Sequence, residues 1–346
     1  MKTWLQQQWN GWTLWHILLM PLSLVFAALS HVRKYLYLSG WRKTYRLDVP
    51  VVIVGNINVG GSGKTPVVIW LAKQLQLAGY TPGIISRGYG GQAQSVQPVF
   101  ADSSAQQVGD EPVLIAQRTS CPVYVSADRV AAGQALLAAH AACNVIISDD
   151  GLQHYRLQRD VEIVVFDSVK AFGNGALLPA GPLRESVARL YEVDAVVSNG
   201  KLNPSGLAFN MNSVRPIEMQ LVSADFYNLV DSQHRCSAQA FSGLKILAIA
   251  GIGNPERFFQ QLRRMGLVFQ SQAYPDHYAF KAADFAAAAA DVIVMTEKDA
   301  VKCQAFAQAN YWVLPVTAVI GDELLPIVLN KLDRLKAHRA GDAKWI

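Results

Sequence analysis

The segment 58–65, with the sequence NVGGSGKT, most limits what this chain can fold into. It follows the apolar run 51–54 and precedes a helical pattern that begins at Pro66. A strand, a glycine-rich loop and a helix in this order are typical of a P-loop, in which backbone N–H groups and the helix N-terminus surround phosphate oxygens. The sequence therefore predicts a nucleoside triphosphate site built by Asn58, Val59, Gly60, Gly61, Ser62, Gly63, Lys64 and Thr65.

Two side chains of this loop have predicted roles. Lys64 is expected to reach the outer phosphates, and the Thr65 hydroxyl is expected to bind Mg²⁺. The strict motif begins with glycine where this chain has Asn58, a residue that tolerates left-handed backbone better than most. A glycine-rich turn without a ligand is the alternative, and the flanking strand and helix disfavour it.

The composition indicates a folded protein with room for about two domains, because the 346 residues are 51% hydrophobic and only 16% charged. The net charge of +5 is uneven: residues 1–47 contain six Lys and Arg and no Asp or Glu, which leaves −1 for the rest. A basic balance confined to one segment favours contact with an anionic surface and gives little support to nucleic-acid binding.

The same basic segment holds five of the eight tryptophans, around the apolar stretch 12–29: Trp4, Trp9, Trp12, Trp15 and Trp41. Tryptophan at the edge of an apolar run is typical of a membrane interface. A helix of this length extends about 27 Å, close to the hydrocarbon thickness of a bilayer. Because His16, Pro21 and Ser23 interrupt it, a spanning helix and an interfacial helix both stay open. A cleaved secretory signal and a buried core helix are less favoured alternatives. The basic cluster 33–46 predicts that the body of the protein lies in the cytoplasm.

Beyond the P-loop, short apolar runs alternate with helical patterns. This rhythm predicts an α/β fold with a P-loop NTPase-type, doubly wound and mostly parallel sheet. Its predicted strands are 51–54, 81–86, 123–125, 144–148, 162–167 and 195–198. The pattern becomes irregular at 201, and an α/β rhythm resumes at 245. We therefore expect a membrane-associated helical arm (1–47), a P-loop domain (48–200), a linker or hairpin (201–243) and a second, smaller α/β domain (244–346).

Two adjacent carboxylates, Asp149 and Asp150, follow an apolar strand where P-loop proteins bind Mg²⁺. Because neighbouring carboxylates repel each other unless a cation joins them, we interpret one of them as a Mg²⁺ ligand and leave open which one. A plain turn is the alternative. Gln153 and His154 follow at once and are expected near the same site, although His154 alone is equally consistent with a surface histidine.

Asp110, at the start of a predicted helix, is a candidate general base. Phosphoryl transfer to a hydroxyl needs a group that accepts the hydroxyl proton, and an aspartate near Mg²⁺ can do so. Together with Glu111 it is equally consistent with a helix N-terminal cap. His277 would pair with such an aspartate across a cleft, although a structural loop histidine is favoured when it is considered alone.

Three arginines lie in loop sequence where a guanidinium can bind phosphate with two hydrogen bonds: Arg87, Arg129 and Arg184. Each of them, taken singly, is more often part of a structural ion pair.

These residues belong to a set of motifs that extends over nearly the whole chain. The motifs are VGN (54–56), GGSGKTP (60–66), SRGYGG (86–91), GDEP (109–112), DDGLQH (149–154), GNG (173–175), LPAGPLRE (178–185), DHY (276–278) and TEKDA (296–300). Together they are highly specific, and the chain resembles the tetraacyldisaccharide 4′-kinase family of lipid A biosynthesis. Asn58 is no departure from this family, whose loop is loose at that position.

The resemblance implies that the chain transfers the γ-phosphate of ATP, with Mg²⁺, to the 4′-hydroxyl of an acylated glucosamine disaccharide 1-phosphate lipid. Asp110 is then the base with His277 as its partner, and Lys64 stabilises the transferring phosphoryl group. Thr65 with Asp149 or Asp150 serves the metal. The remaining implied neighbours are phosphate or headgroup contacts and other site residues: Arg129, Arg184, Ser62, Glu111, Gln153 and His154.

The implied substrate also gives the basic arm a purpose. An acylated disaccharide stays in the bilayer, so an enzyme for its headgroup must approach the cytoplasmic leaflet of the bacterial inner membrane. A membrane-associated P-loop switch ATPase or GTPase acting on a protein partner is the alternative function. ParA-like switches have a lysine where this chain has Val59, and no guanine-reading NKxD lies near 198–201. A scaffold with an inactive loop is disfavoured because Lys64, Thr65 and the acidic pair are intact.

Overall fold

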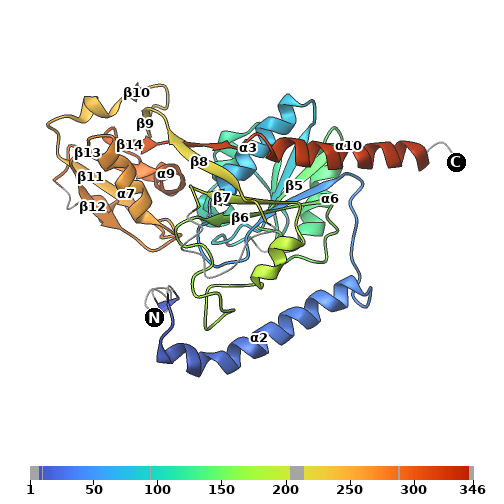
Figure 1. Ribbon diagram of the computed structural model, residues 1–346. Coiled ribbons are helices and arrows are strands. Elements are labelled where there is room, and N and C mark those ends of the chain that lie inside the picture. The colour runs from blue at the N-terminus through green and yellow to red at the C-terminus, as the bar shows by residue number, and fades with distance from the viewer. Residues whose placement is uncertain (1–7, 10, 94, 203–213, 287–288, 343–346) are drawn as a thin grey trace.

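The computed structural model describes residues 8–9, 11–93, 95–202, 214–286 and 289–342. Trp4 of the basic arm and residues 203–213 of the predicted linker lie outside this part of the chain. Two sheets lie side by side in the body, and a long N-terminal helix lies apart from them at the bottom of Figure 1.

The larger sheet forms where the sequence has buried apolar runs, and its order is β15-β8-β7-β6-β1-β5-β2-β4-β3. All neighbouring strands are parallel except β3 with β4 and β15 with β8. This confirms the predicted α/β fold with a mostly parallel sheet. The strands are β1 (Val51–Gly55), β2 (Pro82–Ser86), β3 (Gln97–Val99), β4 (Val123–Val125), β5 (Val145–Asp149), β6 (Val161–Asp167), β7 (Ala195–Asn199), β8 (Ile217–Ser223) and β15 (Val316–Ile320).

Helices cover both faces of this sheet, because alternate residues of a strand point to opposite faces. Val52 and Val54 of β1 share an apolar cluster with residues of α3 (Lys64–Leu77), α5 (Asp110–Arg118) and α10 (Leu324–Asp342). Val51 and Ile53 share the opposite cluster with α6 (Arg129–Ala139). The short helices α4 (Ala105–Val108) and η1 (Val187–Tyr191) lie in the connections. We call these elements the first unit.

The smaller sheet has the order β10-β9-β14-β13-β11-β12 and forms the second unit, on the left in Figure 1. Its core is rich in aromatic side chains, such as Phe226, Phe241 and Trp312. Its elements are β9 (Phe226–Asn228), β10 (Arg235–Cys236), η3 (Ala238–Phe241), β11 (Ile246–Ala250), α7 (Pro255–Arg264), β12 (Gln270–Ala273), α8 (Ala283–Ala286), β13 (Val292–Thr296), α9 (Glu297–Cys303), η4 (Gln304–Phe306) and β14 (Tyr311–Leu314).

The chain returns to the first unit at its end. β15 pairs with β8 over five residues, and α10 buries Leu324, Val328 and Leu332 in the first unit's core. Residues 316–342 therefore lie with the first sheet, although their sequence continues the rhythm of the second. The sequence pattern placed these residues in the second domain, but an apolar strand can pair with whichever sheet edge its connection reaches. The predicted four-part division of the chain stays a prediction.

One element boundary next to the P-loop differs slightly from expectation. α3 begins at Lys64, two residues before the predicted start at Pro66. Proline is tolerated there because N–H groups in the first helical turn have no partner within the helix. Lys64 and Thr65 therefore stand on the helix itself rather than in the loop.

The described part of the arm contains the long helix α2 (Leu14–Leu38), which has many exposed apolar side chains. Of the residues described, this is the one helix that is long and apolar enough to cross a membrane, by length and composition alone. The Ser23 hydroxyl, near its middle, donates to the Leu177 carbonyl at 2.8 Å and accepts from the Ala180 N–H at 2.9 Å. Trp9 Nε1 donates to the Pro179 carbonyl at 3.1 Å. We call residues 174–185, which receive these contacts, the bridging loop.

Candidate active site

The P-loop links β1 to α3 and requires glycine at its last turn. Gly63 has a φ of 93°, and a Cβ added there would lie 2.5 Å from Asn199 Nδ2. Asn199, at the end of β7, donates from this nitrogen to the Ser62 carbonyl at 3.2 Å. Asn56 Nδ2 donates to the Gly60 carbonyl at 3.3 Å. These contacts hold the loop open at the N-terminus of α3, which is the arrangement that binds phosphates.

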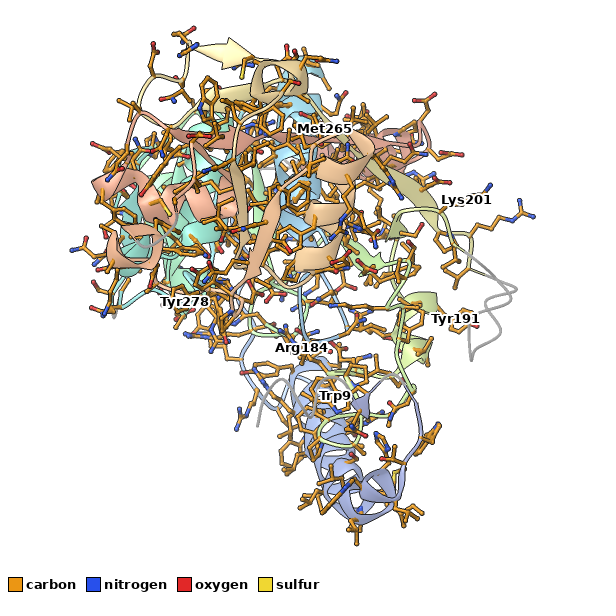
Figure 2. The ribbon with its side chains drawn as sticks, turned by 90° about the vertical axis from the view of Figure 1, so that its left-hand side faces the viewer. Trp9, Arg184, Tyr191, Lys201, Met265 and Tyr278 are labelled. Carbon is orange, nitrogen blue, oxygen red and sulfur yellow. The ribbon has the colours of Figure 1, made fainter. Side chains whose placement is uncertain are left out.

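The bridging loop supports the P-loop from the side of the arm. The Val59 N–H donates to the Pro182 carbonyl at 2.9 Å, and the Arg184 N–H donates to the Ile57 carbonyl at 2.6 Å. Asn58 Nδ2 donates to the Ala171 carbonyl at 2.5 Å. In Figure 2, Arg184 lies at the level where the body meets the arm, above Trp9. The bridging loop therefore contacts both α2 and the predicted triphosphate site.

Asp150 is surrounded by cations. Its carboxylate lies 3.4 Å from Lys64 Nζ and 3.3 Å from Arg184 Nη1. Burial alone would raise the pKa of Asp150, but the charges of Lys64 and Arg184 lower it to about 2. The carboxylate is therefore ionised and already paired.

Asp149 has a different environment. It is fully buried at the end of β5, and its Oδ2 accepts from the Ser86 hydroxyl at 3.1 Å. Its Oδ1 has no hydrogen-bond partner among the residues that the structure describes. Burial, followed by the charges of Glu111 and Asp150, raises the pKa of Asp149 to about 7, against the charge of Lys64. A buried oxygen without a partner is an available ligand for a cation.

Asp110 and His277 meet across the two units. His277 Nδ1 lies 3.0 Å from Asp110 Oδ2 and 3.1 Å from Oδ1, although the residues are 167 positions apart. Burial alone would raise the pKa of Asp110, but the hydrogen bond with His277 and the charge of Lys298 hold it below its ordinary value. Burial lowers the pKa of His277, and the hydrogen bond with Asp110 outweighs this and raises it. The ring of Tyr89 packs edge-on against His277, with centroids 5.0 Å apart.

Lys298 joins the same cluster and had no predicted role. Its Nζ lies 3.0 Å from Glu111 Oε1, 3.1 Å from Asp276 Oδ1 and 4.0 Å from Asp110 Oδ2. Burial lowers the pKa of Lys298, but the three carboxylates outweigh this and raise it above its ordinary value. The sequence signal for this residue was the TEKDA stretch (296–300), which matched the family without suggesting a role.

The remaining predicted residues are more strongly engaged with the protein itself. Arg129 is buried, donates to the Ser126 carbonyl at 3.1 Å and to the Asp150 carbonyl at 3.3 Å, and has a pKa that burial lowers to about 10. Gln153 Nε2 donates to the Asn56 carbonyl at 3.0 Å and to Glu185 Oε1 at 2.6 Å. These two side chains therefore brace the walls of the site.

His154 carries no charge at neutral pH. Burial, followed by the charge of Arg129, lowers the pKa of His154 to about 4. Its Nε2 has no hydrogen-bond partner among the described residues and lies 4.0 Å from Asp128 Oδ1. The ring is thus a neutral group next to Arg129.

No group of three or more His, Cys, Asp and Glu within the described part of the chain has a geometry that could hold a metal ion. This does not argue against Mg²⁺, which usually takes one or two carboxylates and completes its shell with water and phosphate oxygens. Thr65 and Asp149 offer the oxygen ligands that Mg²⁺ prefers, and Asp149 Oδ1 is free to serve.

A P-loop on a doubly wound sheet, with its lysine beside a paired carboxylate and a carboxylate–histidine pair across from it, defines a P-loop phosphotransferase. The comparisons with known proteins refine this class. Residues 15–333 match the model of the family described as "Tetraacyldisaccharide-1-P 4'-kinase". The chain belongs to this family, which confirms the resemblance found from its motifs.

Relatives and a solved structure agree with this assignment. The chain is 49% identical to a tetraacyldisaccharide 4′-kinase of Methylobacillus flagellatus over 332 residues, which cover 96% of each chain. It is 50% identical to that of Azoarcus sp. strain BH72 over 316 residues, which cover 91% of this chain and 92% of the relative. It also resembles the crystal structure of LpxK from Aquifex aeolicus in complex with ATP, with a TM-score of 0.75 and 27% identity. The likeness covers 92% of this chain and 100% of that one.

Proposed function

We propose that this chain transfers the γ-phosphate of ATP to the 4′-hydroxyl of a tetraacyldisaccharide 1-phosphate in lipid A biosynthesis, with Asp110 as the base. Membership of the kinase family supplies the reaction, and the observation that carries the residue roles is the hydrogen bond between Asp110 and His277. This hydrogen bond joins the two units, and we infer that the acceptor hydroxyl meets the triphosphate next to it. The switch ATPase or GTPase alternative is not favoured.

The donor side of the site holds ATP by charge and by backbone N–H groups. The P-loop from Asn58 to Thr65 surrounds the phosphates, and Lys64 reaches toward the oxygens that gain charge during transfer. Arg184 adds a second cation, and Arg129 stands behind it next to Asp150. Because all three cations come from elements fixed around β1 and β5, the site needs little rearrangement to hold a polyanion.

We propose that Mg²⁺ binds at Thr65 and the acidic pair, with Asp149 as the stronger candidate. Asp149 has an unpartnered buried oxygen, whereas Asp150 is already paired with Lys64 and Arg184. When bound, the ion neutralises the charge of the transferring phosphate. Burial raises the pKa of Asp149 to about 7, and the charge of a bound cation would counter this and keep the carboxylate ionised at neutral pH.

On the acceptor side, Asp110 accepts the proton of the 4′-hydroxyl. The hydroxyl oxygen then bonds to the γ-phosphorus, the bond from that phosphorus to the β–γ bridging oxygen breaks, and ADP leaves. The lowered pKa keeps Asp110 ionised and ready to accept a proton. The hydrogen bond from His277 fixes the carboxylate and stabilises it in the charged form. Glu111, Gln153 and His154 complete the walls that face the acceptor.

The arm supports an interfacial rather than a spanning attachment to the membrane. Ser23, in the middle of α2, bonds to the bridging loop, and Lys34, near its end, pairs with Glu192 at 2.5 Å. A helix that is bonded to the body of the protein at its middle and near its end is not free to cross a bilayer. The exposed apolar side chains of α2 and its basic flank suit the cytoplasmic leaflet of the inner membrane.

The reaction is tested with radiolabelled ATP, Mg²⁺ and the tetraacyl disaccharide 1-phosphate in detergent micelles. We expect the label in the lipid, at the 4′ position. The matched control is the same lipid with hydrogen in place of the 4′-hydroxyl, which should take up no label. Hydrolysis of ATP without labelled lipid would support the switch ATPase instead.

The membrane attachment is tested with an added cysteine near the start of α2. In Gly11→Cys, a membrane-impermeant maleimide should label this cysteine in inverted membrane vesicles and not in intact spheroplasts. Labelling from the periplasmic side would contradict an interfacial helix. The protein without the substitution is the control, since three of its four cysteines are buried.

A further inference from the structure

Lys298 lies where the two units meet and contacts carboxylates of both. It belongs to the first turn of α9 in the second unit, yet its Nζ lies 3.0 Å from Glu111 of α5 in the first unit. On its other side it donates to Asp276 Oδ1 at 3.1 Å, in the loop that carries His277. One half-buried ammonium therefore joins the helix that begins with Asp110 to the loop that presents His277.

The His277 loop needs such a contact. His277 has a φ of 61°, a left-handed conformation that is unfavourable for a residue with a side chain. Its N–H donates to Asp276 Oδ1 at 3.1 Å, the same oxygen that Lys298 contacts. The lysine thus restrains the backbone of His277 through Asp276.

The lysine also prevents repulsion. Asp110, Glu111 and Asp276 lie around one point, and without a cation between them three carboxylates would repel each other. Lys302, the other cation that acts on Asp110, already pairs with Asp299 at 2.8 Å. Lys298 is therefore the cation that lets the carboxylates of both units approach.

A second contact of α9 strengthens this arrangement. Glu297, the residue before Lys298, forms an ion pair with Arg118 at the last turn of α5 and accepts from the Val316 N–H at 2.9 Å. Since α5 begins at Asp110 and ends at Arg118, α9 contacts this helix at both of its ends. The position of α5 relative to the second unit is fixed by two neighbouring residues.

We propose that Lys298 is a positioning residue for phosphoryl transfer, which holds Glu111 and Asp276 together so that His277 meets Asp110. This inference rests on the proposed role of Asp110 as the base. Lys298 acts through the Asp110–His277 pair, because its two shortest ion pairs are with Glu111 and Asp276 and its distance to Asp110 Oδ2 is 4.0 Å. Its removal should affect the chemical step more than the binding of ATP.

The test compares Lys298→Met, Lys298→Arg and the surface control Lys331→Met. Lys331 lies on α10 and pairs with Asp194. Misplaced catalytic groups lose on the order of tenfold to a hundredfold in rate, so kcat of Lys298→Met should fall by about this factor. KM for ATP should stay within about threefold, since the P-loop is untouched. Lys298→Arg should recover most of kcat, and Lys331→Met should match the wild type. A kcat of Lys298→Met within about twofold of the wild type, or a loss confined to KM, overturns the proposal.

A double-mutant comparison separates this inference from the base assignment. In an Asp110→Asn background, Lys298→Met should cost less than about twofold, because the pair through which it acts is gone. If Asp110→Asn is strongly impaired and Lys298→Met still adds its full loss, the positioning role is wrong and the base role stands. If Asp110→Asn is nearly normal, the base role itself fails. Should Lys298→Met not fold, Asp276→Asn removes the link to His277 and should lower kcat in the same direction by a smaller factor.

Discussion

The two sides of the active site carry opposite excesses of charge. Around Asp150, three cations gather within the first unit: Lys64, Arg184 and Arg129. Around Lys298, three carboxylates gather across the two units: Asp110, Glu111 and Asp276. The cation-rich side suits a polyphosphate, and the carboxylate-rich side suits the removal of a proton. The contrast indicates that the proposed donor and acceptor sides have opposite electrostatic surroundings.

The largest effect is expected from a substitution on the acceptor side, which should lower kcat. Asp110→Asn removes the base without changing its size, so kcat should fall by about two to four decades while KM for ATP changes little. Steady-state kinetics on the labelled lipid measures this. Asp333→Asn, which removes a carboxylate on α10 that accepts from the Tyr80 hydroxyl, is the control and should keep the wild-type rate. A nearly normal kcat for Asp110→Asn would remove the base assignment.

The next largest effect is expected on the donor side, where a substitution should weaken the binding of ATP. Arg184→Ala removes one cation from Asp150, so kcat/KM for ATP should fall by about tenfold to a hundredfold, with most of the loss in KM. Titration of ATP at saturating lipid separates the two constants. The charge comparison predicts that the cation-rich side binds ATP and that the carboxylate-rich side acts in the chemical step. A loss in kcat alone would contradict this assignment.

Removal of the arm should weaken ATP binding on the donor side, because the arm contacts the P-loop through the bridging loop. A chain lacking residues 1–41 loses the contacts of Trp9 and Ser23 to that loop, which in turn supports the P-loop. Since such indirect coupling amounts to about 0.5–2 kcal/mol, KM for ATP should rise by about twofold to thirtyfold on a detergent-solubilised lipid. Ser23→Ala, which keeps the arm, is the matched variant and should show a smaller rise. The truncated chain should also no longer sediment with vesicles, and unchanged sedimentation would mean that the membrane contact lies elsewhere.

The smallest effect concerns the stability of the acceptor side. The pKa of His277 is raised above its ordinary value of 6.5, so its contribution to the free energy of unfolding is fully present below that value. The contribution is lost as pH rises through the raised value, whereas that of Asp110, whose pKa is lowered from 3.8, is constant in this range. The difference between wild type and His277→Gln in urea unfolding should therefore shrink by roughly 1 kcal/mol between about pH 6 and pH 9. His140→Gln, an imidazole removed beside Tyr124, is the control. A difference that grows with pH would contradict the pairing.

The donor side was more accessible to sequence reasoning than the acceptor side. The P-loop, β5 and the acidic pair form from contiguous residues, whose spacing fixes their chemistry. The pairing of Asp110 with His277 was predicted through the family resemblance, because their contact depends on how two units pack and no local pattern encodes that. The role of Lys298 was missed for the same reason. β12 has only exposed residues and β15 pairs with a distant edge, so neither could be read from apolar periodicity.

The bridging loop also sets a distance. A flexible tether between a membrane anchor and an enzyme would let the active site sample many heights above the bilayer. Here the Ser23 and Trp9 bonds fasten the arm to the loop that contacts the P-loop at Val59 and carries Arg184. With the proposed interfacial attachment, the depth of α2 in the lipid would fix one height of the proposed active site above the bilayer. Only headgroups that protrude to that height would then reach the site.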